Sequence, residues 1–366
     1  MNPLKTFLTI NFGCRVNAAE TNQWSQTLIN QGLTPLVKEG QGRLDIIFIN
    51  TCAVTKKGEK ESINKIKLLN KQYPKAKIYI SGCANFDKIK HLKNIIIVDN
   101  DQKEKTLSTL KSAYTKKIND KFSHTHRYLL KVQSGCSQFC SYCIVPFKRQ
   151  KIYSLSIQDA VNTVNNVVND NYQEIIITGV NLDQYNPGFS NLIESLLEKT
   201  NIKLISFGSI PINCIDQKFI NLFSKYPNRL SHFLHIPIQS GSDKILKLMN
   251  RPYTIKEIKQ KFDKFKKLML RLVKEGDRGR FEFGTDIIVG FPTESDQDFD
   301  KTLNICQKIG FSKIHTFKYS PRPNTKARLL FENSPKISKE ILSHRSQKIR
   351  SIISQNRPPS HQKLEN

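Results

Sequence analysis

Gly135-Cys-Ser-Gln-Phe-Cys-Ser-Tyr-Cys-Ile144 is the most informative segment of this sequence, because it places three cysteines in one short loop. Cys136, Cys140 and Cys143 are separated by three and then two residues, so three thiolates can bind three corners of an iron–sulfur cube and leave the fourth iron without a protein ligand. A zinc site is the alternative. Zinc needs a fourth N or S ligand, for which His124 and His126 are the nearest candidates, and its motifs usually contain paired Cys-x-x-Cys or Cys/His units. The spacing therefore favours an iron–sulfur cluster.

The cysteine loop opens a series of strand-like segments that alternate with helical ones. The sequence predicts strands at Tyr128–Val132, Glu174–Thr178, Lys203–Phe207, Phe233–Ile236, Phe283–Val289 and Lys313–Tyr319. Six strand and helix repeats predict a partial (β/α)6 barrel, whose catalytic loops lie at the carboxyl ends of the strands. The cysteine loop follows the first strand, as this arrangement requires.

A second α/β series precedes the loop. Strands are predicted at Phe7–Phe12, Asp45–Ile49, Lys77–Ile80 and Ile95–Val98, with helices near Ala18–Asn30 and Lys57–Gln72, which indicates an open parallel sheet. Cys14, Cys52 and Cys83 each follow one of the first three strands. Because the carboxyl ends of parallel strands share one edge of the sheet, these three cysteines are expected to converge on a second site. The alternative is three buried structural thiols, the role that we assign to Cys214 and Cys306.

The composition of the chain separates these two regions. Residues 111–127 are polar and basic and are interpreted as a linker, and 356–366 as a disordered tail. The predicted domains are therefore 1–110 and 128–355. The cysteine count is too low for a disulfide scaffold, and no apolar run is long enough for a signal peptide or a membrane span. We expect a soluble cytoplasmic protein without a membrane partner.

The chain of 366 residues has a net charge of +27, for which nucleic acid is the obvious partner. Abundant Lys and Asn throughout the chain leave a solvated basic surface as the alternative. The densest basic segment, Lys256–Arg280, contains Ile258, Phe262, Phe265, Leu268 and Leu272 at helical spacing. This pattern predicts an amphipathic helix first and an RNA contact second.

Several motifs occur in the order found in one enzyme family. They are Asn11–Glu20, Asn50–Thr55, Ser81–Cys83, the cysteine loop, Leu234–Ser242 and Tyr319–Pro323. Together they resemble the radical S-adenosylmethionine (SAM) methylthiotransferases. The resemblance implies an N-terminal methylthiotransferase domain followed by a radical SAM barrel. The family usually continues with a small RNA-binding β-barrel, which we expect this chain to lack.

The resemblance implies two [4Fe–4S] clusters and SAM as cofactors. Cys136, Cys140 and Cys143 would hold the cluster that cleaves SAM to a 5′-deoxyadenosyl radical, and Cys14, Cys52 and Cys83 a second cluster that carries the inserted sulfur. One SAM would methylate that sulfur and another would generate the radical. The residues expected to contact SAM are Tyr142, Thr178, Gly179, Asn181, Gln239 and Ser240. The chain departs from the family pattern after the cysteine loop, at Gln150 and Tyr153.

The segments around Cys14 and Cys52 look most like the branch that modifies N6-threonylcarbamoyladenosine next to the tRNA anticodon. The implied reaction is methylthiolation at adenine C2, with a tRNA anticodon loop, an electron donor of the flavodoxin or ferredoxin type and a sulfur donor as partners. An isopentenyladenosine tRNA and a ribosomal protein are alternative substrates. A non-catalytic iron–sulfur RNA-binding protein is an alternative of another class.

Overall fold

A computed structural model describes residues 5–36, 43–109, 127–274 and 281–356 of the chain. The chain forms two compact units. Unit 1 comprises Met1–Ser137, Ile144–Tyr153 and Thr178–Val180, and unit 2 comprises Gln138–Cys143, Ser154–Ile177 and Asn181–Asn366. Residues 111–126 of the predicted linker, with His124 and His126, and residues 357–366 of the predicted tail lie outside the described residues.

A parallel sheet with the strand order β2-β1-β3-β4-β5 forms the centre of unit 1. Its strands are β1 (Thr6–Asn11), β2 (Thr34–Pro35), β3 (Ile46–Thr51), β4 (Lys77–Gly82) and β5 (Ile95–Ile97). The helices are α1 (Arg15–Asn30), α2 (Lys56–Gln72) and α3 (Lys103–Ser108). The predicted open parallel sheet is confirmed.

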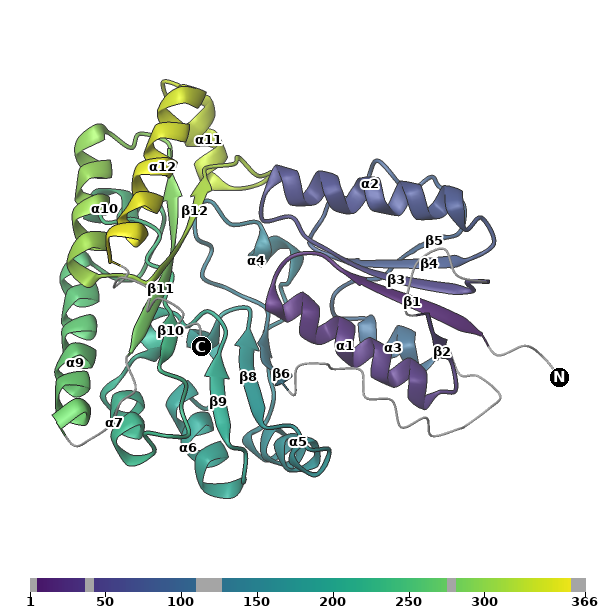
Figure 1. Cartoon of the computed structure of the whole chain (residues 1–366). Coiled ribbons are helices and arrows are strands. Elements are labelled where there is room, and N and C mark those ends of the chain that lie inside the picture. The colour runs from purple at the N-terminus through teal and green to yellow at the C-terminus, as the bar shows by residue number, and fades with distance from the viewer. Residues whose placement is uncertain (1–4, 37–42, 110–126, 275–280, 357–366) are drawn as a thin grey trace, which may run out of the picture. The chain divides into compact units, whose positions relative to one another are not determined.

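Helices cover both faces of this sheet (Figure 1). Side chains of β3 alternate between two hydrophobic clusters: Ile47 and Ile49 pack with Ile66 of α2, and Phe48 packs with Trp24 of α1. Every residue of β3 is buried, as expected for a central parallel strand. The sheet is thus fixed from both sides, and its carboxyl edge is left to the loops.

Unit 2 contains the later strands of the predicted barrel and their helices (Figure 1). Strand β8 (Glu174–Gly179) pairs in parallel with β9 (Leu204–Phe207), and β10 (Phe233–His235), β11 (Glu282–Val289) and β12 (Lys313–Lys318) form a parallel sheet. An isolated bridge between Ser209 and His235 connects β9 to β10. All six predicted strands are present, since the first is β6 (Arg127–Ser134) of unit 1.

The remaining elements lie between and after these strands. They are α4 (Val145–Lys148), β7 (Tyr153–Ser154), α5 (Ile157–Asn169), η1 (Leu182–Gln184), α6 (Phe189–Lys199), η2 (Ile212–Cys214), α7 (Gln217–Lys225), α8 (Asp243–Leu248), α9 (Ile255–Lys274), α10 (Asp296–Ile309), α11 (Lys326–Glu332) and α12 (Lys339–Asn356). Among the residues that the structure describes, no helix is long and apolar enough to cross a membrane.

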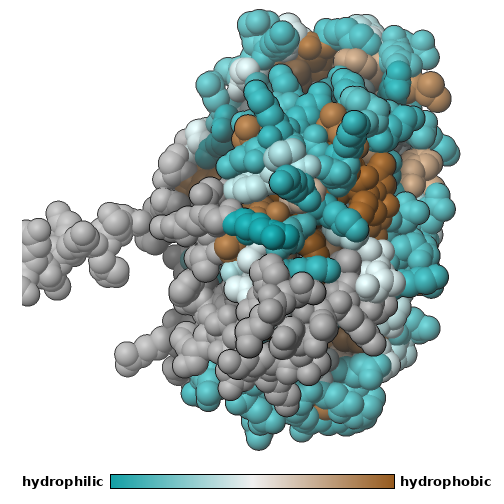
Figure 2. Space-filling model, turned by 90° about the vertical axis from the view of Figure 1, so that its right-hand side faces the viewer, coloured by the Kyte–Doolittle hydropathy of each residue, from teal (hydrophilic) through white to brown (hydrophobic). Residues whose placement is uncertain are grey.

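Helix α9 contains most of the basic segment noted in the sequence. Ile258, Phe262, Phe265, Leu268 and Leu272 are all buried. Phe262 packs edge-on against Phe283 of β11, with ring centroids 5.0 Å apart. The predicted amphipathic helix is therefore confirmed, while its contact with RNA stays a prediction. Figure 2 shows one face of the molecule, on which hydrophilic residues predominate and hydrophobic areas are smaller.

Candidate functional site

Cys14, Cys52 and Cys83 lie at the carboxyl edge of the sheet in unit 1. Their strands end at nearly the same level, because Asn11 pairs with Asn50 and Thr51 pairs with Gly82. Cys14 begins helix α1 at its N-cap, and the Cys83 amide donates a hydrogen bond to the Thr51 carbonyl at 3.2 Å. Cys14 is exposed, Cys52 half-buried and Cys83 buried. The three cysteines therefore lie on one edge of the sheet, as predicted from their positions directly after parallel strands.

Gly13 makes room for Cys52. It has a φ of +98°, and a Cβ atom at this position would lie 2.7 Å from both Cβ and Sγ of Cys52. Any larger residue would displace that sulfur, since real Cβ contacts are never so short. The loop before Cys14 thus closes directly onto Cys52, so the first two cysteines are neighbours.

Asn17 fastens the same two loops. Its Nδ2 donates to the carbonyl of Phe12 and to that of Thr51, both at 2.9 Å. These two carbonyls come from the ends of β1 and β3, so one side chain joins the segments that lead to Cys14 and Cys52. Asn17 thus supports the loop that carries Cys14.

Cys83 has apolar neighbours and one cationic neighbour, Arg149. It packs with Ala53 and Ile144 in one small hydrophobic cluster. Burial raises the pKa of the Cys83 thiol, and the charge and hydrogen bond of Arg149 act in the opposite direction. Cys14 is near enough for its charge to raise the pKa of Cys83 as well. The third thiol therefore lies within the electrostatic reach of the first.

A buried ion cluster surrounds Arg149. Its guanidinium donates from Nη1 to Glu20 Oε1 at 2.7 Å and from Nη2 to Glu20 Oε2 at 2.9 Å. Lys103 Nζ lies 2.5 Å from Glu20 Oε2, and Lys131 Nζ lies 3.3 Å from Oε1. Burial alone would raise the pKa of Glu20, but the bond from Arg149 and the charges of Lys103 and Lys131 hold this pKa well below its usual range. Three cations on one carboxylate leave net positive charge beside Cys83.

A cavity of about 630 Å³ lies beside this ion cluster, within unit 1. Its walls include Glu20, Lys103, Lys131 and Arg149, together with Gly82 and Ala84 on either side of Cys83. The volume is in the range of small-molecule sites, and the cationic wall suits an anionic or strongly polar ligand.

The three cysteines of the loop 135–144 are divided between the two units in the chain. Cys136 belongs to unit 1, where its amide donates to the Arg149 carbonyl at 3.2 Å. Cys140 and Cys143 belong to unit 2, where the Cys143 amide donates to the Cys140 carbonyl at 2.9 Å. Arg251 Nη1 approaches Cys140 Sγ to 3.2 Å. The guanidinium thus places a positive charge beside this sulfur.

The segment Gln138–Cys143 is fastened to the end of helix α8. The Ser141 amide donates to the Met249 carbonyl at 3.0 Å, and its hydroxyl donates to the Leu248 carbonyl at 2.7 Å. Asn250 Nδ2 donates to the carbonyls of Gln138 and Phe139, both at 3.1 Å. The loop that carries Cys140 is thus held in a defined conformation by the rest of unit 2.

The residues expected to contact SAM lie on several elements. Tyr142 packs with Ile288 and Phe317 in a hydrophobic cluster of unit 2. Thr178 and Gly179 end strand β8, and Asn181 is the N-cap of η1. Gln239 has a positive φ of 68°, and the hydroxyl of buried Ser240 lies 3.4 Å from that of Thr302. Their contacts with SAM stay predictions.

The donor atoms fit iron–sulfur clusters. Thiolate ligands suit these clusters, and three per cluster would leave one iron for a small-molecule ligand. Gly13 provides the space that brings Cys52 to the Cys14 loop, and Arg149 and Arg251 each place a cation beside a cysteine of one set. Cys214 and Cys306 are buried elsewhere in unit 2, as predicted for core thiols.

Sequence reasoning missed the partners of these cysteines. Glu20 ends one of the family motifs but has no predicted role there, and no sequence pattern marks Lys103, Arg149 or Arg251. A buried carboxylate with three cations is assembled from residues far apart in the chain, so no local spacing marks it.

Comparisons with known proteins agree with this arrangement. The model of the radical SAM superfamily matches residues 130–306, and that of the uncharacterized protein family UPF0004 matches residues 6–120. The threonylcarbamoyladenosine tRNA methylthiotransferase MtaB of Aquifex aeolicus is 30% identical over 96% of this chain and 88% of its own length. The MtaB protein of Chlamydia pneumoniae is 32% identical over 88% of this chain and 76% of its own length. A tRNA-2-methylthio-N(6)-dimethylallyladenosine synthase of Bdellovibrio bacteriovorus is 26% identical over 86% and 74%.

Solved structures share the fold. The radical SAM methyltransferase TsrM from Kitasatospora setae superposes with a TM-score of 0.64 at 10% identity, over 90% of this chain and 75% of that one. The cobalamin-dependent radical SAM enzyme OxsB gives a TM-score of 0.57 at 12% identity, over 95% and 56%. At these identities the likeness concerns the fold alone. Membership of the radical SAM superfamily implies SAM and a [4Fe–4S] cluster as cofactors. The chain is an enzyme that belongs to the radical SAM methylthiotransferase family.

Proposed function

We propose that this enzyme is a cytoplasmic tRNA methylthiotransferase that places a methylthio group on C2 of N6-threonylcarbamoyladenosine next to the anticodon. The observation that carries the proposal is the convergence of Cys14, Cys52 and Cys83 on one sheet edge, beside the cationic side chain of Arg149. Relatives named for this nucleoside, at 30% and 32% identity, support the choice of substrate.

Two [4Fe–4S] clusters are part of the proposal. Cys136, Cys140 and Cys143 would hold one of them, and Cys14, Cys52 and Cys83 the other. When bound, the first would supply the electron that cleaves one SAM to the radical that takes the C2 hydrogen, and the second would carry the sulfur, which receives its methyl group from another SAM, so that two SAM would be used per turnover.

The side chains around the cysteines would orient and insulate these groups. Arg149 and Arg251 each stabilise a thiolate by charge, and Asn17 holds the loops of Cys14 and Cys52 together. Ala53 and Ile144 exclude water from Cys83, which strengthens the effect of Arg149 on that sulfur. Tyr142, Thr178, Gly179, Asn181, Gln239 and Ser240 are proposed to line the SAM site.

The partners follow from the chemistry. The basic chain, with a net charge of +27, would attract the phosphates of the tRNA anticodon loop. An electron donor of the flavodoxin or ferredoxin type and a sulfur donor would complete the cycle. We assign 1–110 to the methylthiotransferase domain, 111–127 to a linker, 128–355 to the radical SAM domain and 356–366 to a tail.

Expression in a bacterial strain without its own tRNA methylthiotransferases tests the proposal. Nucleosides from total tRNA would be separated and identified by mass spectrometry. The proposal predicts a methylthio derivative of N6-threonylcarbamoyladenosine, which is absent with Cys14→Ala or Cys136→Ala. A methylthio group found only on isopentenyladenosine, or only on a ribosomal protein, would contradict the substrate and leave the enzyme family intact. No modification on either with a fully loaded protein would favour a non-catalytic RNA-binding role.

A further inference from the structure

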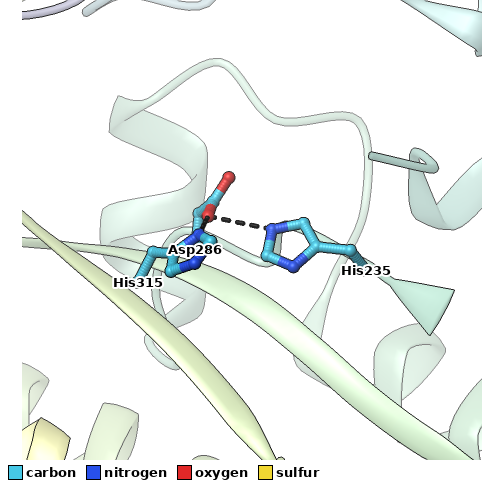
Figure 3. Close-up of side chains that lie close together, drawn as sticks. All are labelled: His235, Asp286 and His315. Atoms are coloured by element: carbon cyan, nitrogen blue, oxygen red, sulfur yellow. Dashed lines mark hydrogen bonds and ion pairs between the residues drawn. The ribbon is translucent and has the colours of Figure 1, made fainter. Parts of the chain in front are cut away.

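Three polar side chains of unit 2 form a cluster that the proposed chemistry does not use (Figure 3). His235 of β10 and His315 of β12 flank Asp286 of β11. Asp286 Oδ1 lies 2.9 Å from His235 Nε2 and 3.2 Å from His315 Nδ1. One carboxylate oxygen therefore joins two imidazoles, and the three side chains come from three adjacent strands.

The strand register places this cluster on one face of the sheet. Asp286 pairs with His315, and His235 pairs with Gly284, so all four residues share a face. Phe283 packs against Phe262 of helix α9, which shows that the alternate residues of β11 point to the helices. The His–Asp–His cluster thus lies on the face turned away from α9.

The same face continues toward the cysteine loop of unit 2. Ile288 and Phe317 follow Asp286 and His315 by two residues and pair with each other across β11 and β12. Both pack in one hydrophobic cluster with Tyr142, which lies between Cys140 and Cys143 in the chain. Two residues along a strand span about 7 Å. The His–Asp–His cluster therefore lies two residues along the strands from Ile288 and Phe317, which pack with Tyr142 of the cysteine loop.

Glycine at position 284 is what admits His235. A Cβ atom there would lie 2.6 Å from His235 Nδ1 and 2.9 Å from Phe233 Cζ. His235 is consequently packed against β11, with only 6% of its surface exposed. It holds Asp286 from the buried side, so the orientation of the carboxylate is set by the packing of the strands.

His315 is the accessible end of the cluster. Its side chain is 46% exposed, against 20% for Asp286. In the tautomer whose Nδ1–H donates to Asp286 Oδ1, the other ring nitrogen of His315, Nε2, is an acceptor. The hydrogen bond with Asp286 orients the ring of His315, and His235 in turn holds Asp286 in place.

We propose that His315 receives the polar N6 substituent of the substrate base, with Asp286 and His235 as positioning residues. This inference rests on the proposed function. A threonylcarbamoyl group offers N–H and O–H donors to Nε2, whereas the isopentenyl group is a hydrocarbon. A site built around a polar acceptor rejects the analogue that leaves this acceptor unpaired. The cluster would therefore contribute to the choice between the two nucleosides.

The test is RNA binding to the anaerobically reconstituted enzyme. Three anticodon stem-loop RNAs of identical sequence carry N6-threonylcarbamoyladenosine, N6-isopentenyladenosine or adenosine, and Kd is measured by fluorescence anisotropy. His315→Phe is expected to weaken binding of the first RNA about tenfold, the effect of one lost hydrogen bond, and to leave the other two unchanged. His315→Gln, which keeps an acceptor, should retain part of the preference.

Lys313→Gln is the matched control, because Lys313 is an exposed cation two residues earlier on the same strand. This substitution should weaken the binding of all three RNAs equally, because it removes only a charge. Equal weakening of all three RNAs by His315→Phe, or an unchanged preference, would overturn the inference. So would stoichiometric zinc or manganese bound to the wild type and lost in His315→Phe while the preference persists, because two histidines and a carboxylate also form a metal site.

Turnover of the wild type separates this inference from the proposed function. A methylthio product on the threonylcarbamoyladenosine RNA, with no loss of preference in His315→Phe, would remove the role of His315 and leave the function standing. A product on the isopentenyladenosine RNA alone would overturn both.

Discussion

Arg149 and Glu20 form a buried ion pair with two hydrogen bonds, at 2.7 and 2.9 Å, across 129 positions of the chain. Lys103 and Lys131 share the same carboxylate. We expect Glu20→Gln to lower the free energy of unfolding by about 3–5 kcal/mol, because it leaves three cations without their counter-charge. Urea unfolding of the apo-protein measures this change.

Glu198→Gln is the control for that experiment. Glu198 pairs with Lys225 at 3.0 Å on the surface, where both side chains are about half exposed. Its loss should cost no more than about 1 kcal/mol. Equal costs for the two substitutions would show that the buried ion cluster does not stabilise unit 1.

Gly13→Ala should remove the N-terminal cluster while the radical SAM cluster remains. The added Cβ would displace Cys52 Sγ, and the reconstituted protein should hold roughly half of the wild-type iron, since one of the two proposed four-iron clusters would be lost. Gly310→Ala is a matched control, because Gly310 also has a positive φ, of 76°, but a Cβ there meets nothing within 4 Å. Full iron content in both variants would contradict the role of Gly13.

The two cysteine sets should separate chemically. Cys140→Ala is expected to abolish 5′-deoxyadenosine formation, because it would remove a ligand of the cluster proposed to bind SAM. Cys52→Ala should leave this formation measurable and abolish methylthio transfer. Chromatography of the small-molecule products and mass spectrometry of the RNA measure the two activities. Loss of SAM cleavage in a folded Cys52→Ala protein would mean that the two sets act as one site.

Thiol labelling of the apo-protein should follow exposure and pKa. Burial raises the pKa of Cys306 to about 12, and Cys306 is fully buried, whereas Cys14 is exposed. Iodoacetamide reacts with the thiolate, so at pH 8 we expect labelling of Cys14 and none of Cys306. Raising the pH toward 12 increases the thiolate fraction of Cys306. Peptide mass spectrometry after timed quenching gives the order, and early labelling of Cys306 at pH 8 would contradict its burial.

Elements with a strong local signal could be predicted from the sequence. Each predicted strand of both series is present, with ends that differ by a few residues, because alternating strand and helix patterns fix a parallel sheet. The position of Cys14, Cys52 and Cys83 on one edge follows from the same rule, since each comes directly after a strand. Helix α9 was also predicted correctly from the spacing of Phe262 and Phe265.

Contacts between distant segments could not be predicted. Glu20 and Arg149 are joined only when β6 and α4 pack into unit 1, and a lone glutamate in a helix gives no sign of burial. His235, Asp286 and His315 come from three strands, and their contact depends on register, which a single sequence does not specify. The space that Gly13 leaves for Cys52 likewise requires coordinates.

A reaction with purified components tests the proposed methylthiolation of N6-threonylcarbamoyladenosine. The reconstituted enzyme is incubated anaerobically with SAM, reductant, sulfide and two tRNAs, one carrying N6-threonylcarbamoyladenosine and the other N6-isopentenyladenosine, and the digested nucleosides are identified by mass spectrometry. We predict a methylthio group on C2 of the threonylcarbamoyladenosine alone, with about two SAM consumed per product when one is used for methylation and one for the radical. A methylthio group on isopentenyladenosine alone would contradict this prediction.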